Sequence, residues 1–466
     1  MAEVAIVGGG IAGLTTAYVL QRRGVPFVLL EAQETFGGVI RSEGAAGFAW
    51  EAGPDSILAQ KAEGIALCRE LGLGDRLVPT NPLTRNVFVL RRGRLHPLPE
   101  GMMLAVPTRI VPFLTSGLFS WLGKLRMGLD LVIPARRADG DESIASFLRR
   151  RFGQECVELL GEPLLAGIHS GDPERLSMRA TFARFVEMER RSGSLIRGLM
   201  LGRRPKGGSG AAFYSLEGGL SGLADALVQR LPAAGLRART AVLSIRAPSA
   251  GRFRLDLEGG ASVEAPAVVV AVPAHKASSA LEGLDRTLAS ELSRIHFVSV
   301  ATVVLGYRRA DVTHPLDGYG LLVPKTEGLR TNAVSFVSTK FPGRAPEGHV
   351  LLRGFLGGAR DETALDLDDK ALAETMRAEM KAILGLRGEP VVTRVHRWPL
   401  STPQMEVGHL DRIRAIDERL AQVPGLFMTG AGLRVTGIPD VVADATAVAT
   451  RAADFVQGPS GPGGEP

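Results

Sequence analysis

The sequence predicts an α/β fold built around a parallel sheet, and the stretch near its N-terminus carries the evidence. Residues 4–7 are a short apolar run of the kind that a strand buried on both faces requires. Three glycines follow in the spacing G-x-G-x-x-G: Gly8, Gly10 and Gly13. A helical stretch, residues 14–23, and a second apolar run, residues 27–30, come next, and Glu31 ends that run. This order of strand, glycine turn, helix, strand and acid is typical of a Rossmann-like dinucleotide-binding unit.

Each of these positions has a physical role in binding a dinucleotide. Gly8 permits a tight turn, Gly10 lets the backbone approach a pyrophosphate, and Gly13 lets the helix pack closely on the strand. The N–H groups at the start of the helix attract the pyrophosphate. The carboxylate of Glu31 can accept hydrogen bonds from ribose hydroxyls and would repel a 2′-phosphate. The alternative interpretation is a glycine-rich turn with a purely structural role.

Two further features favour FAD over NAD. Gly37 and Gly38 form a second glycine pair, and Arg41 follows them, which suits a larger dinucleotide whose far end needs a close backbone approach and a cation. Residues 430–440 are again rich in glycine, and a helix of small residues, 441–455, comes after them. We therefore expect the C-terminal part to return to the nucleotide-binding domain.

The predicted domains are discontinuous in sequence. We expect an FAD-binding domain from residues 1–60, 208–290 and 396–457, a mixed-sheet substrate domain from 61–84 and 291–395, a helical, membrane-associating insert at 85–207, and a disordered tail at 458–466.

The insert contains an uncharged apolar stretch, residues 110–123, which is too short to span a bilayer. One interpretation is a pair of core helices. The other is an interfacial segment that lies among lipid headgroups beside Lys124 and Arg126. In that second interpretation the apolar side chains at the membrane are Phe113, Leu118, Phe119 and Trp121.

Composition excludes several classes of function. The formal charge is +6 and arginines occur in short clusters, which indicates either solvated basic faces or attraction to anionic lipid or an acidic substrate. Nucleic acid is not an expected partner, because no basic motif with interleaved aromatic residues is present. Cys68 and Cys156 form no ligand cluster, and the histidines are scattered, so no metal site is predicted. With no basic leader before the first strand, a cytoplasmic setting is expected.

Taken together, the motifs resemble the flavin monoamine oxidase superfamily, and within it the oxygen-dependent protoporphyrinogen/coproporphyrinogen oxidases of haem synthesis. The resemblance extends from about residue 3 to 456. Its superfamily part is the two glycine turns with Arg41, the pair Val272-Pro273, and residues 430–440. Its more specific part comprises Leu95–Pro99, Pro163–Ile168, Gly171–Ser177, Gly193–Ile196, Pro403-Gln404 and Gly408-His409.

The resemblance implies a non-covalently bound FAD and a set of residues around it. The cofactor-binding residues that it implies are Gly8, Gly10, Ile11, Ala12, Gly13, Glu31, Gly37, Gly38, Arg41, Val242, Trp398, Gly430, Gly437 and Ile438. Val242 would close the adenine side, and Trp398 would lie near the isoalloxazine, with core packing as the alternative role of this tryptophan. Residues 433–437 depart from the family pattern, which usually has an aromatic residue and a further glycine there.

The resemblance also implies a porphyrinogen pocket. Gly167 would lie over the macrocycle, and three side chains would sandwich it: Tyr319, Leu322 and Phe355. For the arginine that pairs with a propionate in some members, Arg85 is the nearest candidate, but an ungapped match from Leu95-His96 places Val87 at that position. No residue is expected to act as a catalytic general base.

The implied reaction is hydride loss from a meso carbon to the flavin, with dioxygen as final acceptor and hydrogen peroxide as product. The substrate expected first is protoporphyrinogen IX, with coproporphyrinogen III as the alternative. The resemblance also implies an enzyme that is peripheral at the inner face of the cytoplasmic membrane, and a homodimer. Rival interpretations are an amine oxidase, a carotenoid-desaturase-like enzyme and a non-catalytic tetrapyrrole-binding flavoprotein.

Overall fold

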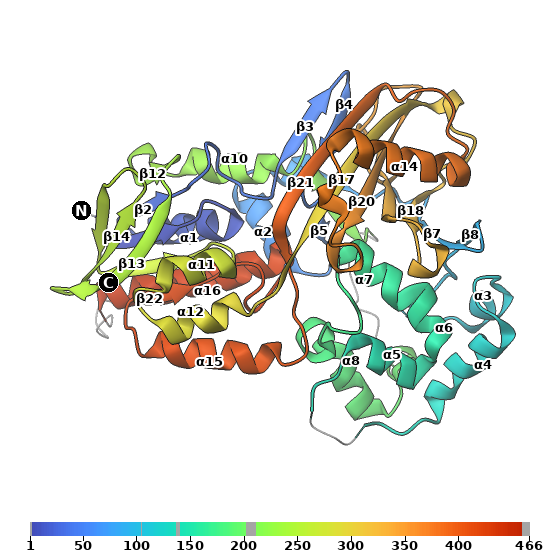
Figure 1. Cartoon of the computed structure of the whole chain (residues 1–466), viewed down its shortest axis with the longest axis horizontal. Helices are drawn as coiled ribbons and strands as arrows, with labels where there is room; N and C mark the ends of the chain where they lie inside the picture. The colour runs from blue at the N-terminus through green and yellow to red at the C-terminus, as the bar shows by residue number, and fades with distance from the viewer. Residues whose placement is uncertain (1, 104, 137–139, 202–210, 459–466) are drawn as a thin grey trace, which may run out of the picture.

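The computed structural model describes residues 2–103, 105–136, 140–201 and 211–458. Within these residues the chain forms a nucleotide-binding region, a large mixed sheet and a helical region (Figure 1). The first and last helices of the described chain, α1 (Ile11–Arg22) and α16 (Ile438–Gln457), both lie in the nucleotide-binding region, at the left of the view. The predicted disordered tail lies outside the described residues except for Gly458. The α/β class with mixed sheets is confirmed.

The nucleotide-binding region is centred on a parallel sheet of five strands in the order β12-β2-β1-β16-β22. Its strands are β1 (Val4–Val7), β2 (Phe27–Leu30), β12 (Leu236–Arg237), β16 (Ala267–Val270) and β22 (Leu426–Met428). β1 and β2 are buried at every position, as apolar runs of this kind require. The strands come from three distant parts of the sequence, so the discontinuous assembly expected for this sheet is present.

Helices and a small sheet cover the two faces of this parallel sheet. One face packs against α1 (Ile11–Arg22), α2 (Ala62–Glu70), α10 (Ser221–Arg230) and α16 (Ile438–Gln457). The other packs against an antiparallel sheet, β13 (Val242–Ser249), β14 (Arg252–Leu257) and β15 (Ser262–Ala265), and against α11 (Ala274–Leu281), α12 (Arg286–Ser293) and α15 (His409–Ala421).

The second large element is a seven-stranded mixed sheet in the order β21-β17-β20-β19-β18-β7-β8. Its strands are β7 (Asn86–Arg91), β8 (Arg94–Pro97), β17 (Phe297–Arg308), β18 (Gly318–Leu322), β19 (Thr331–Phe336), β20 (His349–Gly357) and β21 (Val392–Pro403). β7 pairs in parallel with β18, and the other neighbours are antiparallel. α14 (Asp369–Leu384) packs on one face (Figure 1).

Three strands of this sheet can be compared with the predicted domain bounds. β7 and β8 lie within residues 85–207, the segment predicted as a helical insert, and their hairpin pairs with β18, so it is part of the mixed sheet. β21 begins before residue 396 and runs beyond it, so one strand spans the boundary placed there. Two further small sheets and a hairpin complete the strands: β5 (Ile57–Leu58), β6 (Leu77–Pro79) and β11 (Phe213–Leu216); β9 (Met102–Met103) and β10 (Val106–Pro107); β3 (Ser42–Ala45) and β4 (Phe48–Glu51).

The helical region contains short helices around its own core. They are α3 (Ile110–Thr115), α4 (Trp121–Gly128), α5 (Ile144–Phe152), α6 (Gln154–Cys156), a π-helical turn (Val157–Gly161), α7 (Glu162–Ile168), α8 (Met178–Ser192) and α9 (Leu195–Leu201). Phe113, Leu118 and Phe119 are buried in this core, so their predicted position among headgroups is wrong. Trp121 is exposed. In the described residues no helix has the length and apolar character to cross a membrane.

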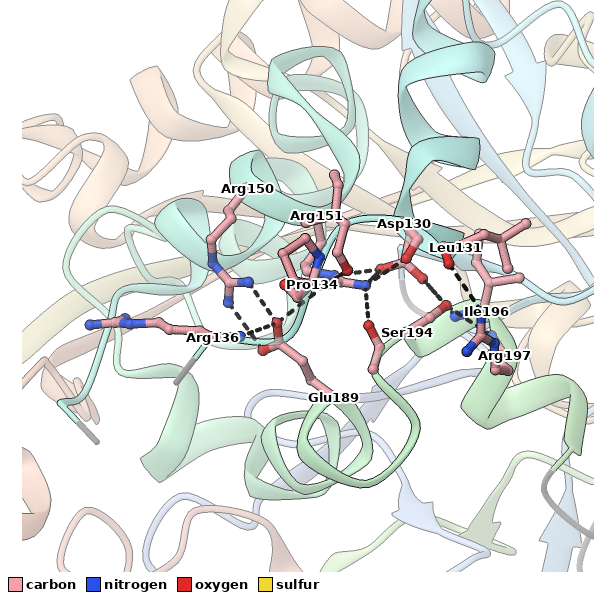
Figure 2. A network of polar contacts seen from close by, with 12 residues as sticks. Asp130, Leu131, Pro134, Arg136, Arg150, Arg151, Glu189, Ser194, Ile196 and Arg197 are labelled. Carbon is pink, nitrogen blue, oxygen red and sulfur yellow. Dashed lines mark hydrogen bonds and ion pairs between the residues drawn. The ribbon is translucent and has the colours of Figure 1, made fainter. Parts of the chain in front are cut away.

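A buried polar network holds the helical region together (Figure 2). The side chains of Arg151 and Asp130 are both fully buried and form an ion pair. Ser194 donates to the Asp130 carboxylate at 2.6 Å, and Arg151 donates to the carbonyl of Gly193 at 3.0 Å. Arg150 donates to Glu189 at 2.6 Å beside it. The turn after α8 is thereby joined to the end of α5, which keeps the core of this region closed.

Candidate cofactor and substrate site

The first glycine turn connects β1 to α1. Gly8 has a φ of +104°, a conformation that favours glycine. A Cβ on Gly13 would lie 1.9 Å from the carbonyl oxygen of Gly8, so the helix contacts the strand through a bare backbone. A Cβ on Gly10, the residue that caps α1, would meet no atom within 4 Å. The turn is therefore tightly packed behind and open in front, where a pyrophosphate would approach.

The second glycine turn lies against the first. The N–H of Gly37 donates to the carbonyl of Gly9 at 2.8 Å. A Cβ on Gly38 would lie 3.2 Å from the Cα of Gly10. Two segments that are distant in sequence thus present adjoining backbone at one place. This proximity is what the two glycine pairs predict for a long dinucleotide that contacts both.

Glu31 lies at the carboxyl end of β2 and is buried. Its carboxylate accepts from the N–H of Gly9 at 2.6 Å and from that of Gln33 at 2.7 Å. Its own carbonyl accepts from the N–H of Thr240 at 2.7 Å, which brings the start of β13, and with it Val242, to this end of the sheet. The acid and Val242 are therefore on one side of the glycine turn, as an adenosine-binding edge requires.

Arg41 points to solvent in this structure. Its side chain is 64% exposed and pairs with Glu43 at 2.8 Å. Its carbonyl accepts from the N–H of Ala52 at 2.8 Å. The backbone of Arg41, rather than its guanidinium, joins the second glycine turn to the segment after β4.

The C-terminal return meets the first glycine turn. A Cβ on Gly430 would lie 3.9 Å from the Cβ of Ala12, and Ala12 packs with Val441 and Ala445 of α16. Gly437 caps this helix and Ile438 opens it in a buried position. Two helix N-termini, of α1 and α16, are thus brought together, and each carries a partial positive charge.

Trp398 lies on β21 and contacts the segment after β4. Its indole N–H donates to the carbonyl of Ala52 at 2.8 Å. The same oxygen accepts from the Thr302 hydroxyl at 3.0 Å and from the Arg353 guanidinium at 3.3 Å. Thr302, Arg353 and Ala52 were not among the predicted site residues. Strand alternation places Arg353 on the same face as Phe355, and that was the signal available in the sequence.

Three of the predicted substrate residues, Gly167, Leu322 and Phe355, lie together. Leu322, Ala333 and Phe355 are opposite one another on β18, β19 and β20 and form one row across the sheet. A Cβ on Gly167, in α7, would lie 3.3 Å from the Cβ of Ala333 and 3.4 Å from a methyl group of Leu322. Gly167 is therefore pressed against the row that contains Leu322 and Phe355.

The other two predicted substrate residues, Tyr319 on β18 and Arg85 just before β7, do not belong to this row. The hydroxyl of Tyr319 donates to the carbonyl of Asn81 at 2.8 Å. Arg85 is exposed on the segment just before β7 and makes no ion pair with any described residue. Val87, the alternative position, is a partly buried part of the helical core and offers no charge.

His169 follows α7 and is a titratable group that the sequence did not single out. Its ring packs edge-on against Phe182, with 6.1 Å between the ring centroids. Burial lowers the pKa of His169 to about 4, so the imidazole is neutral near pH 7. Its carbonyl accepts from the side-chain amide of Gln404 at 3.1 Å.

The arrangement fits FAD. Gly10 leaves open space where a phosphate would approach the N-terminus of α1, and the second glycine turn adds backbone beside it. Glu31 stands at the strand end that faces a ribose in such folds. Both cysteines are buried, and among the described residues no group of His, Cys, Asp and Glu is placed to hold a metal ion. These features define a dinucleotide-binding protein with two adjoining glycine turns and a second, mixed sheet.

The chain belongs to the family of flavin-containing amine oxidoreductases, whose model matches residues 11–456. It is an oxidoreductase, and FAD is its cofactor.

Relatives from several organisms match almost the whole chain. The coproporphyrinogen III oxidase of Bacillus subtilis is 36% identical, over 97% of this chain and 98% of the relative. The chloroplastic protoporphyrinogen oxidase 1 of Spinacia oleracea is 32% identical, over 97% of this chain and 84% of the relative. A crystal structure from Exiguobacterium sp. 255-15, provisionally named a protoporphyrinogen oxidase, superposes with a TM-score of 0.87 at 32% identity, covering 97% of this chain and 98% of that one.

Proposed function

We propose that this enzyme oxidises a porphyrinogen to the porphyrin, with dioxygen as acceptor and hydrogen peroxide as product. The observation that carries the proposal is the apolar row of Leu322, Ala333 and Phe355 beneath Gly167, on the sheet that also bears Trp398. A flat, largely apolar macrocycle needs such a surface, and the names of the relatives point to the same substrate class. Tyr319 and Arg85 lie outside this row and are proposed as further substrate contacts, Arg85 as a partner for a propionate.

The two candidate substrates differ in their side chains. Protoporphyrinogen IX is the substrate expected from the sequence, and coproporphyrinogen III, with additional propionates, was the alternative. Relatives from three bacteria, 32–36% identical, are named coproporphyrinogen III oxidases. We therefore propose coproporphyrinogen III as the substrate to test first. Additional carboxylates require cations, and Arg85 is exposed and without an ion-pair partner among the described residues.

The residues of the chain have the following proposed roles. The N-terminus of α1, opened by Gly10, binds the pyrophosphate, and Glu31 binds a ribose. The N-terminus of α16, at Gly437, favours negative charge at the redox end of the cofactor. FAD, when bound, supplies the electron acceptor for hydride loss from the meso carbon. The pocket orients the macrocycle, and we propose no general base.

The experiment prepares both porphyrinogens anaerobically and adds each to the purified flavoprotein in air. Porphyrin fluorescence and peroxide are followed together. We expect both signals with coproporphyrinogen III, at a higher kcat/KM than with protoporphyrinogen IX. A flavoprotein that yields neither signal would be a non-catalytic binder, and peroxide from an amine without porphyrin formation would favour the amine oxidase alternative.

We also propose a peripheral membrane contact through an exposed apolar surface on and around α3 and α4. This α3–α4 surface comprises Ile110, Val111, Trp121, Leu122, Leu125 and Val132, whose exposed fractions range from 60% to 79%. Several large apolar side chains exposed on neighbouring helices favour an interaction site. Lys124 and Arg126 are turned inward: Lys124 donates to the carbonyl of Leu114 at 2.6 Å, and Arg126 donates to carbonyls of α5. Apolar burial, rather than these two cations, would therefore drive the contact.

The proposed location is the inner face of the cytoplasmic membrane, which follows from this contact together with the expected reducing setting. A homodimer stays a prediction of the family resemblance. Size-exclusion chromatography with light scattering measures the oligomeric state directly.

A further inference from the structure

A charged cluster lies where the second glycine turn meets the mixed sheet: Glu51, Arg344 and Arg353 are buried, and Asp55 and Lys340 are partly buried. The junction cluster, as we name it, consists of Glu51, Asp55, Lys340, Arg344 and Arg353. Glu51 pairs with Arg344 at 3.0 Å, and Asp55 pairs with Lys340 at 2.8 Å. Three cations face two carboxylates, so the cluster carries a formal charge of +1.

The unpaired charge belongs to Arg353. Its side chain is 2% exposed, and no carboxylate of a described residue lies within ion-pair distance of it. It donates to the carbonyls of Ala52 and Gly53, and its guanidinium lies over the ring of Phe355, 4.8 Å from the centroid. Its Nε is buried without a partner. Burial lowers the pKa of Arg353, and Asp55 and Glu51 oppose that effect, but a guanidinium stays charged in a protein.

Neighbouring groups do not cancel this charge. Arg41 and Glu43 pair with each other at 2.8 Å. His396 accepts from the indole N–H of Trp50 at 3.0 Å, and burial lowers the pKa of this histidine. A buried cation without a counter-ion is costly to the folded protein, so a negative charge that forms nearby is stabilised by it.

The cluster is joined to the residues assigned to the redox end of the cofactor. Arg353 and Trp398 donate to the same oxygen, the carbonyl of Ala52. A Cβ on Gly53 would lie 1.8 Å from the carbonyl of Val39, so the acceptors of Arg353 are packed against the second glycine turn. Two-electron reduction places negative charge on a flavin ring, and a fixed cation in a water-poor environment stabilises such charge.

We propose that Arg353 is a positioning residue whose uncompensated charge raises the reduction potential of the bound FAD. The proposal rests on the proposed cofactor site, because it needs the redox ring to lie near Trp398. Arg353 acts through the backbone of Ala52 and Gly53 and through space, and it need not touch the cofactor. The same guanidinium lies over the ring of Phe355, so one side chain contacts both the proposed substrate surface and the backbone beside the proposed flavin site.

The experiment is a charge series measured as the midpoint potential of bound FAD by dye equilibration. Arg353→Met and Lys340→Met each reduce the cluster charge to zero, whereas Asp55→Asn raises it to +2. Arg353→Lys keeps the charge and is the matched control. We expect the first two to lower the potential and Asp55→Asn to raise it, each by about a tenfold change in the reduction equilibrium, or about 30 mV for a two-electron couple. Arg353→Lys should remain near wild type.

The potential separates an electrostatic role from a structural one. A general disturbance of the junction would shift all variants in one direction or leave the potential unchanged while thermal stability falls, and either result overturns the proposal. If Arg353→Met does not fold, the opposite shifts of Lys340→Met and Asp55→Asn still test it. A protein that binds no FAD, or that binds FAD without oxidising a porphyrinogen, refutes the proposed function instead. A working oxidase whose midpoint potential does not change across the charge series refutes only this inference.

Discussion

Gly13 stands so close to Gly8 that a Cβ on Gly13 would lie 1.9 Å from the carbonyl oxygen of Gly8. Gly10, between them, faces open space. The three glycines of one motif therefore have different functions: one carries the packing of helix on strand, and another leaves room for a ligand. Substitutions can separate these functions.

We predict that Gly10→Val weakens FAD binding while the fold stays intact. The valine side chain would occupy the space that the pyrophosphate needs, and Gly10 has a φ of −71° that any residue adopts. We expect at least a tenfold loss of FAD affinity, about 1.4 kcal/mol, measured by fluorescence titration of the apoprotein. Gly13→Ala is the matched control and should destabilise the apoprotein to urea. Normal FAD affinity in Gly10→Val would contradict the assignment.

The second prediction concerns Trp398. Trp398→Phe keeps the aromatic ring and removes the N–H that donates to Ala52 at 2.8 Å. Because Thr302 and Arg353 still donate to that oxygen, the free energy of unfolding should fall by only about 0.5–1.5 kcal/mol. Urea denaturation measures this loss. A change in the flavin absorption spectrum of Trp398→Phe is expected as well, and an unchanged spectrum would favour the alternative of core packing alone.

The parallel sheet could be predicted because its signals are local. Residues 4–31 contain a strand, a turn, a helix and a strand in succession, and each has its own pattern. The three hydrogen bonds to the carbonyl of Ala52 could not be predicted, because their donors lie on strands 250 to 346 residues away in the sequence. The apolar stretch after Ile110 was ambiguous for the same reason, because the sequence does not show which of its side chains the rest of the domain covers. Phe113 is buried and Trp121 is exposed, although both lie in one apolar run.

Gly167 provides a test of the substrate pocket. A leucine there would collide with Ala333 and Leu322, which already lie 3.3 and 3.4 Å from an ideal Cβ. We predict that Gly167→Leu abolishes porphyrin formation while FAD stays bound, because α7 must move away from the row that supports the macrocycle. Turnover is followed by porphyrin fluorescence, and bound flavin by absorption. Undiminished turnover would mean that the macrocycle binds elsewhere.

The α3–α4 surface should govern vesicle binding. Trp121, Leu122 and Leu125 have exposed fractions of 69%, 79% and 69%. Burial of one such side chain contributes about 1.5–3 kcal/mol, so replacing all three with serine should weaken binding to phosphatidylcholine vesicles more than tenfold in a flotation assay. Leu243→Ser, at a 58% exposed position on β13, is the control and should bind like wild type. Equal loss in the control, or no loss in the triple variant, would contradict the contact.

The last prediction concerns the pH dependence of stability at His169. Burial lowers the pKa of His169 from an ordinary value of 6.5 to about 4. Between pH 6.5 and pH 4 the imidazole is therefore protonated in the unfolded chain and neutral in the folded chain. The free energy of unfolding consequently falls as the pH drops through this range, by on the order of 3 kcal/mol in total. His169→Phe, which keeps a ring against Phe182, should remove this part of the decline. Urea denaturation of both proteins at pH 7.5 and pH 5 measures it, and parallel losses of stability in the two would show that His169 does not resist protonation in the folded protein.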